Sequence, residues 1–452
     1  MTQQQSKTIE SARPVIYDRA RDHSEDLPPA VIIVGPPWPR SGTGRVIQNQ
    51  VNYYRARGYF TVFIAVPFAW HYIRVSQNLT ELMEGLKELG ADRVCIATLD
   101  DRKYATAKYM ASVRHVFRGT TLDWQVAIGE AARLSQCDLE FLSKLRPSVL
   151  HVNHVYTLRF ALNLRRRLFD DRLPSILETH DVQSQFIQGR GEPNPWTRRP
   201  DQFERLIKSE TKLLEKANVL IHLSVDDSEL FQTLLPSKPH FLALPTIDED
   251  SGSVAQSVPP LGESIDLLFV GYSNPFNLAA VKWFFEEVWP LIADRGYRVR
   301  IVGTIGSMVE RELPRLYDMF RSSFVGEVAD LFAYYRAARC VIAPMVWGSG
   351  ISIKTIEALA VGKPFVGTGK AFRGMPMEQL KKVGIQAHDE PQGFADAIVH
   401  ALGNEAAAQA LSRTAYNEVF SVEANSAARD KALHAALHAA QPKSLLRRLR
   451  LL

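Results

Sequence analysis

The chain has 452 residues, enough for two to four domains at the usual roughly 100–200 residues each. Hydrophobic residues make up 46% and charged residues 23%, which is typical of a globular protein and excludes a fibrous, collagenous or wholly disordered chain. Lys and Arg total 54 against 49 Asp and Glu, and the five cations after Asp430, with no acid among them, equal the whole excess of +5. Residues 1–430 are therefore balanced in charge, and no nucleic-acid binding is expected of the body of the protein.

Cysteine usage and hydropathy favour a reducing compartment and no membrane span. The sequence has three scattered cysteines and no CxxC pair, so neither a disulfide framework nor a structural zinc site is expected. No apolar run reaches the roughly 18 residues of a membrane span, and the polar first residues show no signal-peptide core. The sequence therefore predicts a cytoplasmic protein.

Short β-branched runs separated by stretches of helical spacing predict strands that alternate with helices. Residues 1–28 are polar, with charges of both signs, and predict a mobile arm. The strands expected next are Val31–Gly35, Thr61–Val66, Val94–Leu99, Ser148–Asn153, Ser175–His180, Val219–Ser224 and His240–Pro245. They are apolar at nearly every position, as strands buried on both faces of a parallel sheet are.

A polar segment rich in Ser, Gly and Pro, at residues 248–263, predicts a linker. The alternation then restarts, and the strands expected after the linker are Ile265–Gly271, Val299–Gly303, Cys340–Pro344 and Pro364–Thr368. Strands that alternate with helices form parallel sheets with crossovers. The sequence thus predicts two α/β domains in tandem, at residues 29–247 and 264–423.

The C-terminal segment, residues 424–452, predicts an Ala-rich helix over Ala424–Gln441 and then a basic amphipathic tail. One helical face of the tail carries Leu445, Leu446, Leu449 and Leu452. Four cations from Lys443 onward accompany these leucines, which suits the surface of an anionic membrane and predicts a protein peripheral to the inner face of the membrane. The alternative is that the leucines pack on the protein's own first domain.

Ligands of open parallel sheets bind at the carboxyl ends of the strands, so the residues that follow each strand are the first candidates for a site. The first strand leads into Gly35–Gly44 (GPPWPRSGTG), a Gly-rich turn that opens a helix and can present N–H groups to an anion. It lacks the lysine of a P-loop, and a flexible loop stays open as the alternative. Later strands end in polar residues, which are either structural or functional. The candidates for a site among them are His151, His154, His180 and Asp181.

The strongest pattern lies at Val341–Thr368, in the second half of the chain. A predicted strand ends at Pro344, and the turn Gly348–Gly350 leads into a helix that carries Lys354 and Glu357 in its first turns. Free N–H groups at a helix N-terminus and the charge of Lys354 suit a phosphate, while Glu357 offers two acceptors to a diol such as a ribose. The alternative is an exposed helix with a surface Lys–Glu pair.

This segment resembles the signature of the retaining glycosyltransferases of the GT-B fold, in the large glycosyltransferase family 4 (group 1). Residues 269–290 and 301–338 are similar to flanking parts of that family's donor domain, and residues 203–224 to the end of its first domain. The resemblance covers residues 31–401. It implies an α/β protein of two tandem Rossmann-like, doubly wound domains that face a cleft, with the nucleotide-sugar mainly on the second domain and the acceptor mainly on the first.

Carried over residue by residue, the resemblance assigns Glu357 to the second glutamate of the E-x7-E motif, which holds the ribose. It matches His154, or else His151, to a histidine that contacts the sugar. The catalytic candidates that follow are His154, Lys354 and Glu357, and the acceptor-side candidates are His151, His180 and Asp181. The donor-binding candidates that it implies are Gly42, Gly44, Gly271, Gly303, Ser349, Gly350, Ile351, Lys354 and Glu357. Two features depart from the family pattern: Ser349 stands where the first glutamate is usual, and the usual Arg and Lys after Gly271 are missing. Lys354 is the replacement cation.

The sequence therefore predicts a retaining hexosyl- or related transferase. It would move a sugar from a nucleotide diphosphate sugar to a hydroxyl of a sugar or lipid-linked acceptor, in cell-surface polysaccharide or glycolipid synthesis. No cofactor or metal is required, because no paired-Asp motif is present to hold one. Ser349 motivates the main rival, a non-catalytic sugar-nucleotide-binding or scaffolding subunit. A GT-B-like sugar-nucleotide epimerase is a further rival, but it would need more carboxylates after the strands.

Overall fold

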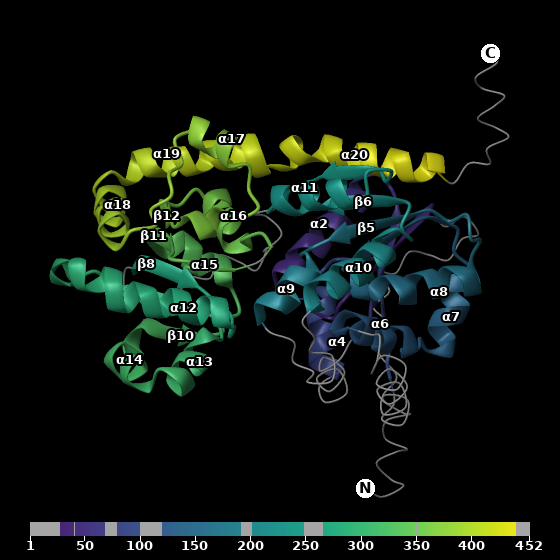
Figure 1. Ribbon diagram of the computed structural model, residues 1–452, viewed down its shortest axis with the longest axis horizontal. Coiled ribbons are helices and arrows are strands. Elements are labelled where there is room, and N and C mark those ends of the chain that lie inside the picture. Colours follow the sequence, from purple (N-terminus) through teal and green to yellow (C-terminus); the bar gives the residue numbers. More distant parts are fainter. Residues whose placement is uncertain are drawn as a thin grey trace, which may run out of the picture. The chain divides into compact units, whose positions relative to one another are not determined.

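The computed structural model describes residues 28–39, 41–67, 79–99, 120–190, 201–247, 265–348 and 350–439 (Figure 1). The chain forms two compact units. The first consists of the residues up to Leu223, Asp227–Leu242 and the residues from Ala428 onward, and the second of Ser224–Asp226 and Ala243–Ala427. Outside the described residues lie the predicted arm up to residue 27, the linker, Ser349 and the tail from residue 440.

The first unit is built on a seven-stranded, wholly parallel sheet with the strand order β3-β2-β1-β4-β5-β6-β7. Its strands are β1 (Ala30–Gly35), β2 (Phe60–Ala65), β3 (Arg93–Ile96), β4 (Pro147–Asn153), β5 (Ser175–Thr179), β6 (Val219–His222) and β7 (His240–Leu242). Each overlaps a predicted run. The strand order reverses between β1 and β4, and the carboxyl ends at such a switch point form the crevice where open α/β sheets bind ligands.

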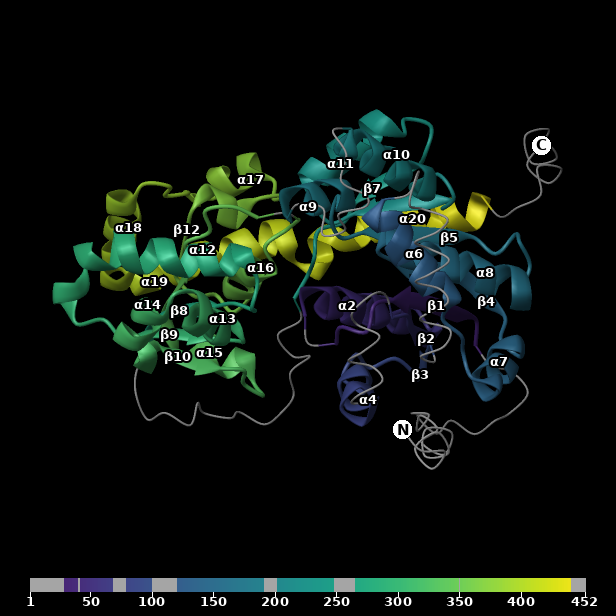
Figure 2. The same ribbon diagram turned by 60° about the horizontal axis from the view of Figure 1, so that its bottom comes forward.

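Helices cover both faces of this sheet because nearly every strand residue is apolar and buried. They are α2 (Gly42–Ala56), α4 (Leu79–Lys87), α6 (Thr121–Ala131), α7 (Gln136–Ser143), α8 (Leu158–Leu168), α9 (Gln183–Arg190), α10 (Gln202–Leu214) and α11 (Val225–Leu234), with a 3-10 turn at Val155–Thr157. Ile32 and Val34 of β1 share one apolar cluster with residues of α6, α8 and α10. Figure 2 labels these three helices in the first unit. Alternate residues of the strands point to the opposite face, which α2 covers.

The second unit repeats the design with a five-stranded parallel sheet of order β10-β9-β8-β11-β12. Its strands are β8 (Ile265–Val270), β9 (Val299–Val302), β10 (Phe324–Gly326), β11 (Ala338–Ala343) and β12 (Phe365–Gly367). Its helices are α12 (Pro275–Trp283), α13 (Ile305–Glu312), α14 (Pro314–Met319), α15 (Leu331–Ala337), α16 (Ile353–Ala360), α17 (Met377–Lys382), α18 (Pro391–Gly403) and α19 (Glu405–Ala415). The switch point here lies between β8 and β11.

The last helix, α20 (Val422–Ala439), begins two residues before the predicted start, and its residues from Ala428 onward belong to the first unit. There Asp430 accepts a hydrogen bond from the Tyr53 hydroxyl of α2 at 2.7 Å and forms an ion pair with Arg57 at 2.7 Å. The neighbouring Arg429 is buried against β5. Among the helices that the structure describes, none combines the length and apolar character needed to cross a membrane.

Two of the predicted donor-side glycines meet where β8 and β9 end. The backbone of Gly303 has φ +111°, and a Cβ atom at this position would lie 2.3 Å from the carbonyl oxygen of Gly271. That carbonyl accepts the N–H of Ile305 at 3.2 Å, and the N–H of Gly303 donates to the carbonyl of Gly326 at 2.7 Å. The strand ends therefore reach this close approach only without a side chain at Gly303.

Gly303→Ala is expected to lower the stability of the second unit by about 2–4 kcal/mol, because it adds a backbone clash to an unfavourable φ. The measurement is the midpoint of thermal unfolding, which should fall by several degrees. Gly393→Ala in α18 is the matched control, since a Cβ there meets nothing within 4 Å. Equal midpoints for the two variants would contradict the packing described for Gly303.

Candidate functional site

In the second unit, the predicted phosphate-facing residues lie at the carboxyl end of the sheet, on the helix that follows β11. Gly350 has φ +62°, a left-handed conformation that favours glycine, and it carries the chain toward the start of α16 at Ile353. Ile351 lies half-buried beside it. Lys354 and Glu357 then fall three residues apart, at neighbouring positions on the surface of α16.

Lys354 is held by neutral groups. Its ammonium donates to Asn277 Oδ1 at 2.7 Å and lies 4.3 Å from the centroid of the Phe269 ring, with Met345 Sδ at 3.8 Å. The Asn277 amide is oriented in turn, since its Nδ2 donates to the Tyr272 carbonyl at 2.8 Å. Burial and, to a smaller extent, the charge of Arg373 lower the pKa of Lys354 to about 7, against the opposing effect of Glu357. The neighbours in these three contacts are uncharged, so a phosphate would bring a full negative charge to the ammonium.

Glu357 is buried and fixed by a tyrosine. The hydroxyl of Tyr335, on α15, donates to Glu357 Oε2 at 2.9 Å, and the tyrosine itself is fully buried. This hydrogen bond fixes the orientation of the Glu357 carboxylate. Tyr335 was not among the predicted site residues, because only the packing of α15 against α16 brings the two side chains together.

Partly exposed aromatic side chains follow the ends of two adjacent strands, β8 and β11. Tyr272 follows β8 and is 42% exposed, and Trp347 follows β11 and is 36% exposed. Trp347 meets the Phe276 ring edge to face, with the centroids 4.4 Å apart. Phe276 immediately precedes Asn277, the partner of Lys354. None of these aromatic residues was among the predicted site residues, although Tyr272 and Trp347 each follow a predicted strand within a few residues.

In the first unit, the Gly-rich turn is a tightly built helix start. Ser41 Oγ accepts the N–H of Gly44 at 3.2 Å and donates to the Trp38 carbonyl at 2.9 Å, so Ser41 caps α2, which begins at Gly42. A Cβ atom at Gly44 would lie 2.0 Å from the Pro39 carbonyl oxygen. Gly44 is therefore required by packing, whatever the turn binds.

His154 joins this turn to the ends of β4 and β5. Its Nε2 lies 3.1 Å from Thr43 Oγ1, and its ring stacks on His180 with a centroid distance of 4.0 Å and on Tyr156 at 4.9 Å. It is the one non-glycine residue with positive φ, +64°, among those that the structure describes. Such backbone strain gathers at functional sites. Burial holds the pKa of His154 well below its ordinary value, so the ring is neutral.

His180 and Asp181 follow β5 and are held by two neighbouring groups. His180 Nε2 lies 2.8 Å from Asn153 Oδ1, and burial lowers the pKa of His180 to about 4. Just after Asp181, the Glu210 carboxylate accepts the first N–H groups of α9, from Gln183 and Ser184, both at 2.8 Å. Glu210 thereby fixes the backbone that follows Asp181, at the start of α9.

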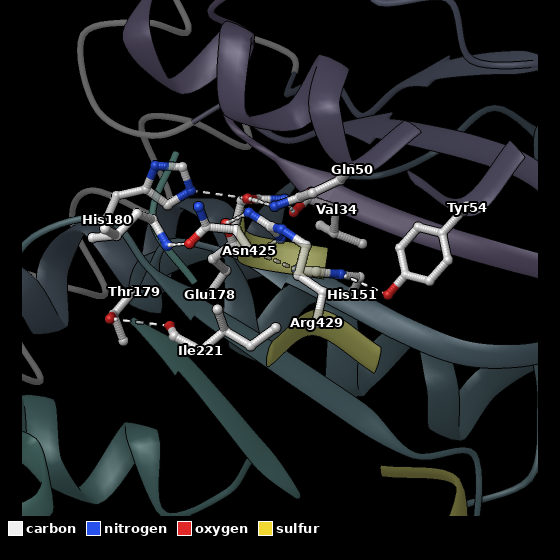
Figure 3. A network of polar contacts seen from close by, with 12 residues as sticks. Val34, Gln50, Tyr54, His151, Glu178, Thr179, His180, Ile221, Asn425 and Arg429 are labelled. Carbon is white, nitrogen blue, oxygen red and sulfur yellow. Dashed lines mark hydrogen bonds and ion pairs between the residues drawn. The ribbon is translucent and has the colours of Figure 1, made fainter. Parts of the chain in front are cut away.

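His151, the other acceptor-side candidate, lies in the core. Its Nδ1 pairs with the Tyr54 hydroxyl at 2.8 Å, and its Nε2 with Glu178 Oε2 at 3.0 Å (Figure 3). Both ring nitrogens are thus occupied, whereas His154 lies at the strand end. Of the two histidines that the sequence left open for the sugar contact, the structure therefore places His154 at the binding edge of the sheet and His151 beneath it.

No three or more His, Cys, Asp or Glu side chains converge as metal ligands in the part of the chain that the structure describes. The site residues instead form two groups, each at the carboxyl edge of its own sheet. The first unit contributes Gly42, Gly44, His154, His180 and Asp181. The second unit contributes Gly271, Gly303, Gly350, Ile351, Lys354 and Glu357.

A family model of known proteins matches part of the chain. Residues 264–404 match the family model described as "Glycosyl transferases group 1". The match contains Lys354 and Glu357 and lies within the second unit. No curated protein sequence matches the chain significantly.

Solved structures match over most of the chain. A glycosyltransferase from Rickettsia africae ESF-5 has a TM-score of 0.56 and 11% identity, over 90% of this chain and 98% of that one. Anabaena Alr3699/HepE in complex with UDP-glucose has a TM-score of 0.55 and 13% identity, over 89% and 98%. The N-terminal domain of a Candida albicans trehalose-6-phosphate phosphatase has a TM-score of 0.55 and 12% identity, over 90% and 100%.

These similarities confirm the predicted fold class, an α/β protein of two Rossmann-like domains of the GT-B type. At such low sequence identity, these structural similarities show the fold alone. The second unit carries a glycosyltransferase group 1 domain, which supports a glycosyltransferase.

Proposed function

We propose that this protein is a retaining glycosyltransferase that moves a sugar from a nucleotide diphosphate sugar to a hydroxyl of a sugar or lipid-linked acceptor. The observation that carries the proposal is the pairing of Lys354 and Glu357 in the first turns of α16, within the segment that matches the glycosyltransferase group 1 model. The donor then binds mainly on the second unit, and the acceptor mainly on the first.

Lys354 is the proposed partner of the diphosphate. Its ammonium is partly buried and contacts the uncharged side chains of Asn277 and Phe269, so a phosphate oxygen there would stabilise the charged form. When the bond from the sugar to the diphosphate breaks, negative charge grows on the leaving phosphate. A fixed cation and the N–H groups of a helix start stabilise that charge more than they stabilise the intact donor, which is how such groups accelerate a reaction.

Glu357 is the proposed partner of the ribose, and aromatic rings stand near the expected place of the sugar. Tyr335 holds one oxygen of the carboxylate, which sets its direction toward a diol. Trp347 and Phe276 offer flat apolar faces of the kind on which sugar rings rest.

His154 is the proposed sugar contact of the first unit. A neutral imidazole can donate or accept a hydrogen bond with a sugar hydroxyl at pH 7. The chemical step needs no nucleophilic side chain. The acceptor oxygen bonds to the anomeric carbon on the face that the diphosphate leaves, and a leaving phosphate oxygen takes the acceptor proton.

The experiment that tests the function is a thermal-shift panel of UDP-, GDP- and ADP-sugars on the full chain. UDP-sugars come first, because Alr3699/HepE is known with UDP-glucose. A ligand at about 100 times its dissociation constant adds roughly 2.7 kcal/mol of stability. Release of nucleoside diphosphate from the stabilising donor, and the anomeric configuration of the transferred sugar by NMR, then decide between the enzyme and the non-catalytic subunit. Binding without release or transfer would favour the subunit.

Glu357→Gln should lower kcat/KM for the donor about tenfold or more, since a hydrogen bond to a charged acceptor contributes roughly 1.5–3 kcal/mol. The variant keeps an acceptor for Tyr335, so the fold should persist. Glu378→Gln on α17 is the matched control, because that side chain is 86% exposed. Steady-state kinetics of both variants is the measurement, and equal values for Glu357→Gln and the control would refute the ribose assignment.

Donor affinity should fall as the pH rises above 7. The pKa of Lys354 is about 7 in the free protein, so the ammonium is charged below that pH and mostly neutral at pH 8. Phosphates raise this pKa on binding, so binding takes up a proton, and affinity should drop up to about tenfold by pH 8. Calorimetry of the nucleotide-sugar in two buffers of different ionisation enthalpy measures the uptake. Lys354→Arg should show neither the uptake nor the decline, and an unchanged pH dependence in it would point to another group.

Peripheral attachment to the inner face of the membrane, and a role in polysaccharide or glycolipid synthesis, belong to the same proposal. They are supported by the cations and leucines of residues 443–452. The full chain should co-sediment with anionic vesicles at low salt and be released by high salt, while a chain that ends at Pro442 stays in solution. Equal sedimentation of both chains would exclude the tail as the anchor.

A further inference from the structure

The C-terminal helix supplies a buried cation to the first unit. Glu178 of β5 has no exposed surface, and its carboxylate oxygens receive the Arg429 guanidinium at 2.9 and 3.3 Å (Figure 3). His151 Nε2 lies 3.0 Å from the same carboxylate. Burial by itself raises the pKa of the Glu178 carboxyl, but Arg429 and His151 outweigh it and keep the carboxyl ionised.

Glu178 also supports the strained residue of the site through its main chain. Its carbonyl accepts the N–H of His154 at 3.1 Å. Two residues further along the chain, the His180 ring stacks on the His154 ring with a centroid distance of 4.0 Å. The end of β5 therefore fixes both the backbone and the ring of His154, and the position of that strand end depends on a charged group that is stable only with its partner.

A pair of buried amide side chains also holds His180. Gln50 of α2 and Asn153 of β4 exchange two hydrogen bonds between their amide groups, at 2.8 and 2.9 Å. Asn153 Oδ1 lies 2.8 Å from His180 Nε2. Both Gln50 and Asn153 are fully buried. His180 is thus placed by β5, which Arg429 holds, and by an amide pair that Arg429 does not contact.

We propose that Arg429 is a positioning residue for His154 and His180. By pairing with Glu178 it sets the end of β5, and this strand end holds His154 at φ +64° with its ring stacked on His180. Arg429 lies 251 residues from Glu178 in the sequence and contacts neither ring directly in the network described. Its effect on sugar transfer rests on the proposed function, whereas its effect on the two rings does not.

Two variants separate positioning from stability. Arg429→Met leaves a buried carboxylate without its partner and should lower the unfolding midpoint strongly. Arg429→Met with Glu178→Gln removes both charges, so most of the midpoint should return. Asp430→Asn is the matched control, because it removes the negative charge that α20 presents to Tyr53 and Arg57 without reaching Glu178.

The first measurement is the NMR spectrum of the full chain with 13C-labelled histidines, in which His154 and His180 are assigned by His→Gln substitution. In the double variant the resonances of both rings should shift, and kcat should fall about tenfold while KM for the donor changes little. Asp430→Asn should match the parent in both. A double variant that folds with parental resonances and parental kcat would overturn the proposal.

If the double variant does not fold, the NMR spectrum of Arg429→Lys tests the proposal instead. This variant keeps the positive charge but loses the bidentate contact with Glu178. Shifted His154 and His180 resonances support positioning, and parental resonances overturn it. If the parent shows no transfer activity at all, only the proposed function fails. The NMR comparison needs no substrate and still tests Arg429.

Discussion

A carboxylate buried in the middle of a parallel sheet needs a cation, and in this protein the cation comes from the far end of the chain. Glu178 lies on β5 among strands that are otherwise almost wholly apolar. Its ionised form is stable there because Arg429 and His151 surround it. The face of the sheet that carries α2 is completed by residues 428–439 of α20. Loss of either charge would leave the other unpaired in a medium that solvates it poorly.

Burial acts on each charged or titratable group of the site, and the outcome depends on the partner that each group finds. Glu178 stays charged because its cation is in contact. His154 and His180 stack on one another without a carboxylate in contact, so burial makes both neutral. Lys354 contacts the uncharged side chain of Asn277 and has a pKa of about 7, which leaves it ready to gain its charge when an anion arrives. The neutral His154 and His180 rings of the first unit suit a sugar hydroxyl. Lys354 of the second unit, whose charge depends on its surroundings, suits a diphosphate.

Both units place their functional side chains at the same topological position, and glycine makes the approach possible in each. Gly44 allows α2 to start against the Pro39 carbonyl, and Gly303 allows β9 to end against Gly271. These close approaches are set by backbone atoms, so they hold whether or not a ligand is bound. The glycines that the family resemblance assigned to donor binding therefore have a structural role in the fold as well.

The sequence by itself determined the order of strands and helices, the parallel sheets and the position of Lys354 and Glu357. Apolar runs, Gly-rich turns and helical spacing are local features that can be read along the chain. The partners of these residues were decided by tertiary structure: Tyr335 for Glu357, Asn277 for Lys354 and Arg429 for Glu178. Tertiary structure also separated His154 from His151, which lie three residues apart on the same strand and its end, because burial and strand pairing decide which ring reaches the edge of the sheet. Such contacts join residues 22 to 251 positions apart, and no periodicity or short motif encodes them.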